Sequence, residues 1–323
     1  MRTLIRSAAL VLVGAFVVAC STPASVSPSA STGPSAAASP SAEASAAASA
    51  EAPSASATAC AKESLATKTA GKLTIATDNP AFPPYFDPPA SGEPKTDPWE
   101  LGDPTNGRGF ESAVAYAVAD KLGFAKEDVS WTYVKFENAY APGPKPFDFD
   151  INQVSFTPER AQAVDMSDGY YTVNQALVAN KDTPITKVTT VSGLKDFKLG
   201  AQQGTTSYQF IQDAIQPSTE TSVYDDNTAA IAALDAKQID GIVVDLPTAF
   251  YITAAQMKNG VIVGQFQANS GGDAEHFSLV LEKGSTLTSC VNEAIAALKS
   301  DGTLDAITKE WLSDKANAPV FQP

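Results

Sequence analysis

From Lys72 onward, short apolar runs alternate with segments whose apolar residues recur every three or four positions. The run Leu73–Thr77 predicts a β-strand that ends at the turn-forming residues 78–80. Four-residue spacing of apolar side chains predicts a helix over Phe110–Leu122, closed by Gly123. Alternating strands and helices are typical of an α/β fold.

The remaining pattern forms two such sets, followed by a late return strand. Further strands are predicted at Val129–Phe136, Phe147–Phe156, Lys198–Ala201, Ser222–Tyr224, Ile239–Val244, Val261–Val263 and Phe277–Leu281. Helices are predicted to open near Thr157, Gly204 and Asp226 or Asn227, and the last helices run from Val291 to Trp311. We therefore expect two lobes, 60–174 with 274–323 and 175–273, joined by crossings at Tyr171–Val178 and Gln267–Phe277. A cleft between two lobes suits a small ligand.

The first twenty residues have the pattern of a targeting segment. Arg2 and Arg6 precede an apolar run, Ala8–Val18, that is too short to span a bilayer comfortably. The segment 17–20 resembles the lipobox of bacterial lipoproteins, which makes Cys20 the predicted site of lipidation and residues 1–20 a lipoprotein signal peptide. The alternative is an ordinary secretory signal with an incidental cysteine.

Residues 21–59 are almost entirely serine, alanine and proline, with Val26 as the one larger apolar side chain. Such a segment cannot bury enough surface to offset the entropy of ordering it. We expect a disordered tether between the membrane and the folded part.

Charge and composition exclude several functions. The formal charge of −14 disfavours nucleic acid and anionic lipid surfaces as partners. A single histidine, His276, and three cysteines leave little material for a soft-metal site or a histidine-based triad. We expect no metal, no cofactor and no catalytic residue.

Cys60 and Cys290 remain after Cys20 is assigned to the lipid. Outside the cell, an even pair of cysteines is usually a disulfide, which would tie the start of the folded part to a helix near the C-terminus. The alternative is a pair of free thiols.

Arg160 gives the sharpest functional signal. It lies in the first turn of a predicted helix, where the macrodipole disfavours a cation by about 0.3–1 kcal/mol. A carboxylate ligand would explain that placement, because the planar guanidinium can grip it with two parallel hydrogen bonds. The alternative is a surface arginine paired with Asp165 or Glu159.

The segment Gly204, Thr205 and Thr206 opens a helix and offers backbone N–H groups and hydroxyls to an anion. An ordinary helix cap is the alternative, and the absence of a following lysine excludes a P-loop. Asp78 and Asp245 each follow an apolar strand, where α/β folds place ligand contacts, and either could neutralise an ammonium group. Their alternative role is to cap the next turn.

Phe82 and Tyr85 form an aromatic loop stiffened by three prolines. Their rings can cover an alkyl chain or face a cation, or they can pack within their own lobe.

The order of these motifs resembles the extracellular solute-binding proteins of polar amino acid ABC importers (family 3 solute-binding proteins). The motifs are Gly71–Asp78, Pro83–Tyr85, Gly109–Glu111, Ser155–Arg160, Val164–Tyr171, Gly204–Thr206, Ile239–Asp245, Lys299–Leu304 and Trp311–Leu312. The resemblance covers the chain from about Gly71, and its most specific part is Ser155–Arg160 followed by Val164–Tyr171.

That resemblance implies a type II periplasmic-binding-protein fold of class α/β, with a hinge and a ligand cleft between the lobes. It also implies roles for individual residues. Arg160 and Thr206 would hold the ligand α-carboxylate, and Asp245 with Ser155 the α-ammonium. The side-chain pocket would be walled by Phe82, Tyr85 and Phe136, with Asp78 nearby.

Two features depart from the family pattern. Gln153 stands where a small residue is common, so its side chain is expected to enter the cleft and alter specificity. The segment Pro88–Gly107 is longer than the usual hairpin and is expected to form a flap beside the pocket.

The resemblance implies the binding component of an ABC importer, with an amino acid and the permease subunits as partners. We expect a monomer that is not an enzyme, anchored by Cys20 to the extracellular (or periplasmic) face of the cell membrane. One alternative is an enzyme on the same scaffold, such as a cyclohexadienyl dehydratase, which turnover of prephenate or arogenate would reveal. A receptor sensor domain is weakened because no membrane span follows Trp311 in this sequence.

Overall fold

The structure is a computed structural model in which residues 60–267, 274–312 and 318–322 are described. The predicted signal segment with Cys20, the tether, and most of the second predicted crossing lie outside these residues. Among the described helices, none has the length and apolar character needed to cross a membrane.

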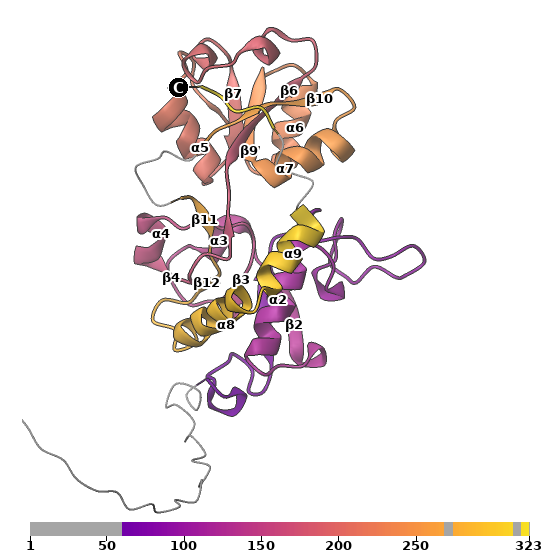
Figure 1. Cartoon of the computed structure of the whole chain (residues 1–323), viewed down its shortest axis with the longest axis vertical. Helices are drawn as coiled ribbons and strands as arrows, with labels where there is room; N and C mark the ends of the chain where they lie inside the picture. The colour runs from indigo at the N-terminus through magenta and orange to yellow at the C-terminus, as the bar shows by residue number, and fades with distance from the viewer. Residues whose placement is uncertain (1–59, 268–273, 313–317, 323) are drawn as a thin grey trace, which may run out of the picture. The chain divides into compact units, whose positions relative to one another are not determined.

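The first lobe is built on a five-stranded sheet in the order β2-β1-β3-β12-β4. Strand β1 is parallel to β2 and β3, whereas β12 is antiparallel to β3 and β4. The strands are β1 (Leu73–Thr77), β2 (Val129–Tyr133), β3 (Phe149–Asp150), β4 (Asp165–Met166) and β12 (Val280–Leu281). The helices are α2 (Phe110–Lys121), α3 (Phe136–Ala139), α4 (Pro158–Ala163), α8 (Thr288–Ser300) and α9 (Thr303–Leu312). Figure 1 shows α2, α8 and α9 together in this lobe.

The predicted helix of the first lobe is confirmed as α2. Phe110, Val114 and Val118 are fully buried, so the four-residue spacing marks the face that packs into the core. The residue before the helix must be glycine: Gly109 has φ of 96°, and a Cβ there would lie 2.5 Å from the carbonyl oxygen of Tyr85. The helix start is therefore fixed against the aromatic loop.

The second lobe has a five-stranded sheet in the order β10-β6-β9-β7-β8. Strand β7 is parallel to β8 and β9, and β6 is antiparallel to β9 and β10. The strands are β6 (Gln175–Asn180), β7 (Leu199–Gln202), β8 (Ser222–Tyr224), β9 (Gly241–Asp245) and β10 (Gly260–Gln265). The helices are α5 (Thr206–Phe210), α6 (Asn227–Asp235) and α7 (Leu246–Tyr251), with π-helical turns η6 (Ile211–Ile215) and η7 (Ile252–Gln256).

Short 3₁₀ helices occur in both lobes: η1 (Lys62–Ser64), η2 (Pro104–Asn106) and η3 (Lys126–Asp128) in the first, and η4 (Pro184–Lys187) and η5 (Ser192–Leu194) in the second.

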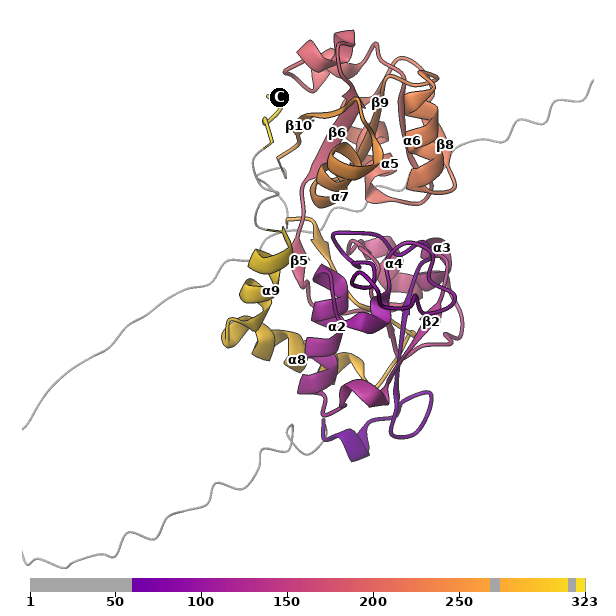
Figure 2. The ribbon, with the colours of Figure 1, turned by 90° about the vertical axis from the view of Figure 1, so that its right-hand side faces the viewer.

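The chain passes between the lobes through a two-stranded antiparallel pair, β5 (Tyr171–Thr172) and β11 (His276–Phe277). Figure 2 shows β5 at the start of the segment that leads up to β6. The predicted first crossing, Tyr171–Val178, therefore contains the start of an unpredicted strand, because β6 begins at Gln175 and its six residues are all buried. A strand buried on both faces has no polar alternation to identify it.

The end of the chain differs from the expected lobe boundary. Residues 318–322 contact the second lobe, although 274–323 were expected to belong to the first. The backbone N–H of Phe321 donates to the carbonyl of Gln265 at 3.0 Å, and the Phe321 ring stacks on Phe266 with centroids 4.7 Å apart. Because β10 is an edge strand, this segment covers backbone groups that would otherwise be unpaired.

Two predicted strands of the first lobe are shorter than expected. Strand β2 ends at Tyr133 because α3 begins at Phe136, whose backbone N–H donates to the carboxylate of Asp78 at 3.2 Å. The run Phe147–Phe156 contains only β3, since Gln153 has φ of 49° and turns the chain out of the extended conformation.

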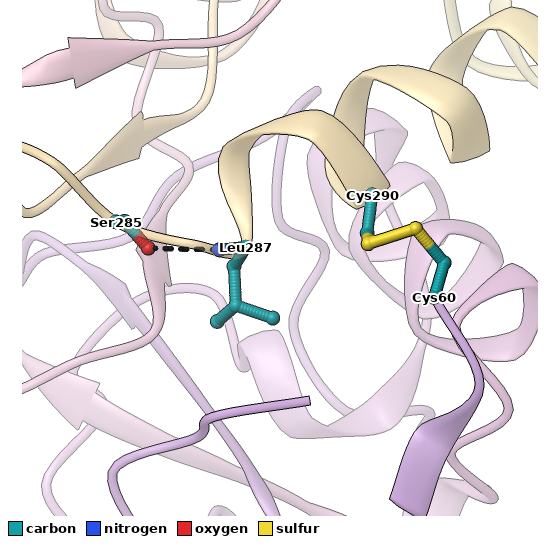
Figure 3. The surroundings of a disulfide bond; sticks show 4 residues. All are labelled: Cys60, Ser285, Leu287 and Cys290. Carbon is teal, nitrogen blue, oxygen red and sulfur yellow. Dashed lines mark hydrogen bonds between the residues drawn. A yellow bond between two sulfur atoms is a disulfide. The ribbon is translucent and has the colours of Figure 1, made fainter. Parts of the chain in front are cut away.

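The predicted disulfide between Cys60 and Cys290 is confirmed, and the alternative of free thiols is wrong. Their Cα atoms are 5.4 Å apart, and the bond joins residues 230 positions apart in the sequence. Figure 3 shows Cys60 at the start of the described chain bonded to Cys290 on α8. The bond ties the entry of the first lobe to one of its core helices.

Replacing both cysteines (Cys60→Ser with Cys290→Ser) should lower the free energy of unfolding by roughly 3–5 kcal/mol, because the long closed loop restricts the unfolded chain. Thermal unfolding with and without a reductant measures this. The reduced parent protein should unfold where the double variant does, and the double variant should ignore the reductant. An identical melting temperature for parent and double variant would contradict the expectation.

Candidate ligand-binding site

A cavity lies between the two lobes and is lined by side chains from loops, strands and helices of both. Both lobes contribute predicted site residues to its wall. These are Asp78, Phe82, Phe136, Gln153 and Arg160 from the first lobe, and Thr205, Thr206 and Asp245 from the second. Ser155, Tyr85 and Gly204 contact lining residues without lining the cavity themselves.

Arg160 lies in the first turn of α4 and is only 8% exposed. Its Nη1 donates to the carbonyl of Ser155 at 2.5 Å, and its Nη2 donates to the carbonyl of Gly204, in the second lobe, at 2.8 Å. Its guanidinium also lies 4.4 Å from the ring centroid of Tyr140. Burial lowers the pKa of Arg160 from its usual value.

The alternative of a surface arginine paired with Asp165 or Glu159 is wrong. The carboxylate of Asp165 instead pairs with Lys283 at 3.4 Å and accepts from the hydroxyl of Thr288 at 3.0 Å. Arg160 is thus a buried cation that bridges the lobes.

The turn before α5 combines a cap with a cavity wall. The Thr205 hydroxyl accepts from the backbone N–H of Tyr208 at 3.1 Å, so the alternative of an ordinary helix cap holds for this residue. The Thr206 hydroxyl instead donates across the lobes to the Ser155 hydroxyl at 3.4 Å. Gly204 has φ of 72°, and a Cβ there would lie 2.5 Å from the Tyr140 hydroxyl. Only glycine allows this close approach of the two lobes.

Asp245 is placed at the end of β9, and its side chain does not cap the following helix α7. Its Oδ1 instead accepts from Nε2 of Gln175 at 2.7 Å. Burial, followed by repulsion from Glu275, raises the pKa of Asp245 to about 8. The Asp245 carboxyl therefore does not fix the helix; it lies on the wall of the cavity.

Three residues that were not predicted from the sequence, Gln175, Ser207 and Glu275, complete this corner. Glu275 accepts from the Ser155 hydroxyl at 2.7 Å and lies 3.2 Å from Nε2 of Gln175. The Ser207 hydroxyl donates to Oε1 of Gln175 at 2.6 Å, which turns the amide NH₂ group toward the acids. None of the three belongs to a recognisable motif. The only available signal was that Gln175 and Glu275 stand directly before the apolar residues of β6 and next to the start of β11.

Asp78 has the capping role proposed as its alternative, yet it also lines the cavity. Its two oxygens accept from the backbone N–H groups of Asn79 at 2.7 Å and of Phe136 at 3.2 Å. Burial raises the pKa of Asp78, and the charges of Glu137 and Asp226 add to the rise. Asp226 lines the same cavity from the second lobe.

The two aromatic residues of the proline-rich loop differ in their placement. Phe82 lines the cavity, whereas Tyr85 is fully buried, with its ring 5.6 Å from Phe82 and 6.3 Å from Phe277 between centroids. The Tyr85 hydroxyl lies 3.2 Å from the hydroxyl of Thr248, which lines the cavity. Tyr85 therefore supports the wall through Phe82 and Thr248.

Gln153 lines the cavity but is held from behind by Glu111. The backbone N–H of Gln153 donates to Oε1 of Glu111 at 2.7 Å, and its side-chain amide and the Tyr170 hydroxyl donate to the same carboxyl group. Burial raises the pKa of Glu111 to about 7. These hydrogen bonds explain how a non-glycine residue tolerates positive φ at this position.

The long segment 88–107 lies beside the cavity. Leu101 lines the cavity and is 36% exposed, while Trp99 packs into the lobe at 4% exposed. Asn79 anchors the segment by donating to the carbonyl of Pro98 at 2.9 Å and accepting from Glu100. An apolar side chain is thus held at the rim of the cavity.

Known proteins share this architecture. The chain is 26% identical over 222 residues to the arginine-binding extracellular protein ArtP of Bacillus subtilis (strain 168), covering 67% of this chain and 82% of that protein. It is 31% identical over 215 residues to the L-cystine-binding protein TcyJ of Escherichia coli (strain K12), covering 65% and 76%. A solved structure of an ancestral arginine-binding protein bound to arginine matches with a TM-score of 0.59 and 26% identity, covering 75% of this chain and 98% of that one.

These likenesses confirm the predicted two-lobed α/β fold of type II periplasmic binding proteins. The family model described as bacterial extracellular solute-binding proteins, family 3, matches residues 91–314. Since this match spans well over half of the sequence, the chain belongs to the bacterial extracellular solute-binding proteins of family 3.

Proposed function

We propose that this protein captures an amino acid outside the cell and delivers it to the permease of an ABC importer. The observation that carries the proposal is the presence of a buried guanidinium, Arg160, and a partly buried carboxyl, Asp245, on opposite lobes around one cavity. An amino acid brings a carboxylate and an ammonium group, and each pole requires an opposite partner when water is removed. The named functions of ArtP and TcyJ support the same class of ligand.

In this proposal Arg160 and Thr206 hold the ligand α-carboxylate. The guanidinium carries five N–H donors, so the two carbonyls that it contacts leave donors for a ligand. The Thr206 hydroxyl lines the cavity and is free to rotate from Ser155 toward a carboxylate oxygen. Asp245 and Ser155 receive the α-ammonium.

Closure of the lobes follows because the two groups that bind the ligand come from different lobes. Arg160 comes from the first lobe and Asp245 from the second, so a ligand that contacts both binds the closed arrangement better than an open one. The pair β5 and β11 between the lobes provides the hinge about which such a movement takes place.

The charge of the cavity favours an amino acid with a cationic side chain. Once Arg160 and Asp245 are assigned to the two poles, the carboxylates of Asp78 and Asp226 remain on the lining. A guanidinium or ammonium at the end of the ligand side chain would relieve their mutual repulsion. Phe82 and Phe136 supply the apolar wall for the alkyl part.

We also propose that Cys20 carries a lipid that anchors the mature protein to the outer face of the cell membrane. The support is the lipobox-like segment that ends at Cys20 and the serine-, alanine- and proline-rich segment that follows it. The enzyme alternative has no supporting observation among the described residues, and we expect purified protein to leave prephenate and arogenate unchanged.

Arg160→Ala should weaken amino acid binding by about 2–5 kcal/mol, because it removes the partner of the buried carboxylate. Screening the twenty amino acids by thermal shift, followed by calorimetry on those that raise the melting temperature, measures the loss. Arg108→Ala is the matched control, since Arg108 is exposed and pairs with Asp87 outside the cavity. The role of Arg160 is refuted if its alanine variant binds as tightly as the parent.

Asp78→Asn and Asp226→Asn test the preference for a cationic side chain. Each should reduce the preference for arginine over its neutral analogue citrulline by about 10-fold, the effect of losing roughly 1.4 kcal/mol of charge pairing. Asparagine keeps the N-cap acceptor that Asp226 offers to Ala229. Competition calorimetry gives the ratio, with the exposed Asp235→Asn as control. Equal ratios in all variants would place the side-chain subsite elsewhere.

Cys20→Ser should move the protein from the membrane fraction to the medium or periplasm and abolish labelling by radioactive palmitate. Fractionation of cells that express parent and variant, with immunoblotting, makes the measurement. An ordinary secretory signal would instead give the same soluble distribution for both.

A further inference from the structure

Asp245 and Glu275 share one hydrogen-bond donor. Nε2 of Gln175 lies 2.7 Å from Oδ1 of Asp245 and 3.2 and 3.3 Å from the two oxygens of Glu275. Because Ser207 donates to Oε1 of Gln175, the NH₂ end of the amide faces both acids. An amide NH₂ group has two protons, so it can serve two carboxyl groups at once.

Glu275 also connects the cavity to the crossing between the lobes. Its backbone carbonyl accepts from the N–H of Val173 at 3.0 Å, and the strand β11 follows directly. Its side chain accepts from the Ser155 hydroxyl, which in turn receives the Thr206 hydroxyl. The residue therefore contacts the first lobe, the second lobe and the crossing.

The surroundings favour a protonated Asp245 over an ionised one. The negative charges of Glu275 and of Glu111 on α2 act on Asp245, and so does the positive charge of Arg160 on α4. Its charge in turn acts on the hydroxyls of Tyr85 and Tyr171, and both of these are neutral near pH 7. Two neighbouring carboxylates that are partly shielded from water repel each other, and a proton on Asp245 removes this repulsion.

We propose that Asp245, which lies beside Glu275 across the Gln175 amide, carries a proton while no ligand is bound, and that the ligand's ammonium group displaces this proton. Glu275 is then a positioning residue that acts through Gln175 and Ser155. The inference rests on the proposed function, because it requires Asp245 to receive the α-ammonium. In the step, a carboxyl O–H bond breaks, the proton passes to solvent, and the ammonium keeps its three protons while donating to the new carboxylate.

The sign of the pH dependence follows. With the pKa of Asp245 at about 8, its carboxyl group is protonated at pH 6 and 7 when no ligand is bound, so binding must remove a proton. The dissociation constant should fall by about 10-fold for each pH unit between 6 and 8 and then level off.

Calorimetry counts the released protons. Titrations at pH 7 in phosphate and in Tris, which differ in ionisation enthalpy, give the number released per bound ligand. The probe is whichever of L-arginine and L-glutamine raises the melting temperature more. The parent should release close to one proton, and Glu275→Gln should release at least half a proton less, since its neutral amide no longer repels an ionised Asp245. Glu310→Gln, the same change on an exposed part of α9, should match the parent.

The possible results distinguish a failure of this proposal from a failure of the proposed capture of an amino acid. Binding without proton release in the parent, or equal release in parent and Glu275→Gln, overturns the proposed protonation of Asp245 beside Glu275 while leaving amino acid capture intact. Failure of all twenty amino acids to bind overturns the capture function itself. If Glu275→Gln does not fold by circular dichroism, the parent decides alone: a dissociation constant that stays constant from pH 6 to 8 refutes the proposal.

Discussion

The arrangement of the two lobes around the cavity depends on a buried cation, Arg160, whose own lobe provides only one of its two main-chain hydrogen-bond acceptors. Arg160 belongs to the first lobe, yet one of its two main-chain acceptors is the carbonyl of Gly204 in the second. A buried guanidinium without acceptors would be strongly destabilising, so this hydrogen bond links the position of the second lobe to the charge of the first. A ligand carboxylate can compete for the same donors, which makes lobe closure and ligand binding one process.

The crossing between the lobes is more than a tether for this movement. The paired strands β5 and β11 lie close in sequence to residues that bond to Asp245 or to each other, with Gln175 three residues after β5 and Glu275 directly before β11. Under the proposed function, a change in hydrogen bonding where the ammonium group binds therefore occurs within three residues of the crossing. The C-terminal segment on β10 adds a third covalent connection, since Phe321 packs on the second lobe after α9 has packed on the first.

Residues with a local signature could be predicted, and residues that act across the lobes could not. Arg160 was identifiable because a cation in the first turn of a helix opposes the dipole, and Asp245 because it ends an apolar strand. Cys60 and Cys290 were identifiable from compartment and number. Gln175 and Glu275 lie 100 residues apart, and no pattern near either one indicates that the fold brings them together. Tyr85 was predicted to line the ligand pocket but is fully buried, because residue spacing alone cannot distinguish a cavity wall from the core behind it.

An excess of buried acid distinguishes this cavity from a neutral pocket. Glu111, Asp150 and Asp245 are all buried close to it, and burial raises the pKa of each. Among the described residues, both oxygens of Asp150 lack a hydrogen-bond partner, and Lys145 is the basic group that acts on it. Each of these carboxyl groups is easier to keep neutral than ionised, and each would become easier to ionise beside a new positive charge. Under the proposed function, these acids therefore favour a ligand that carries more positive than negative charge. The cause is the same as for their raised pKa values, since a positive charge and a bound proton each reduce the cost of burying a carboxylate.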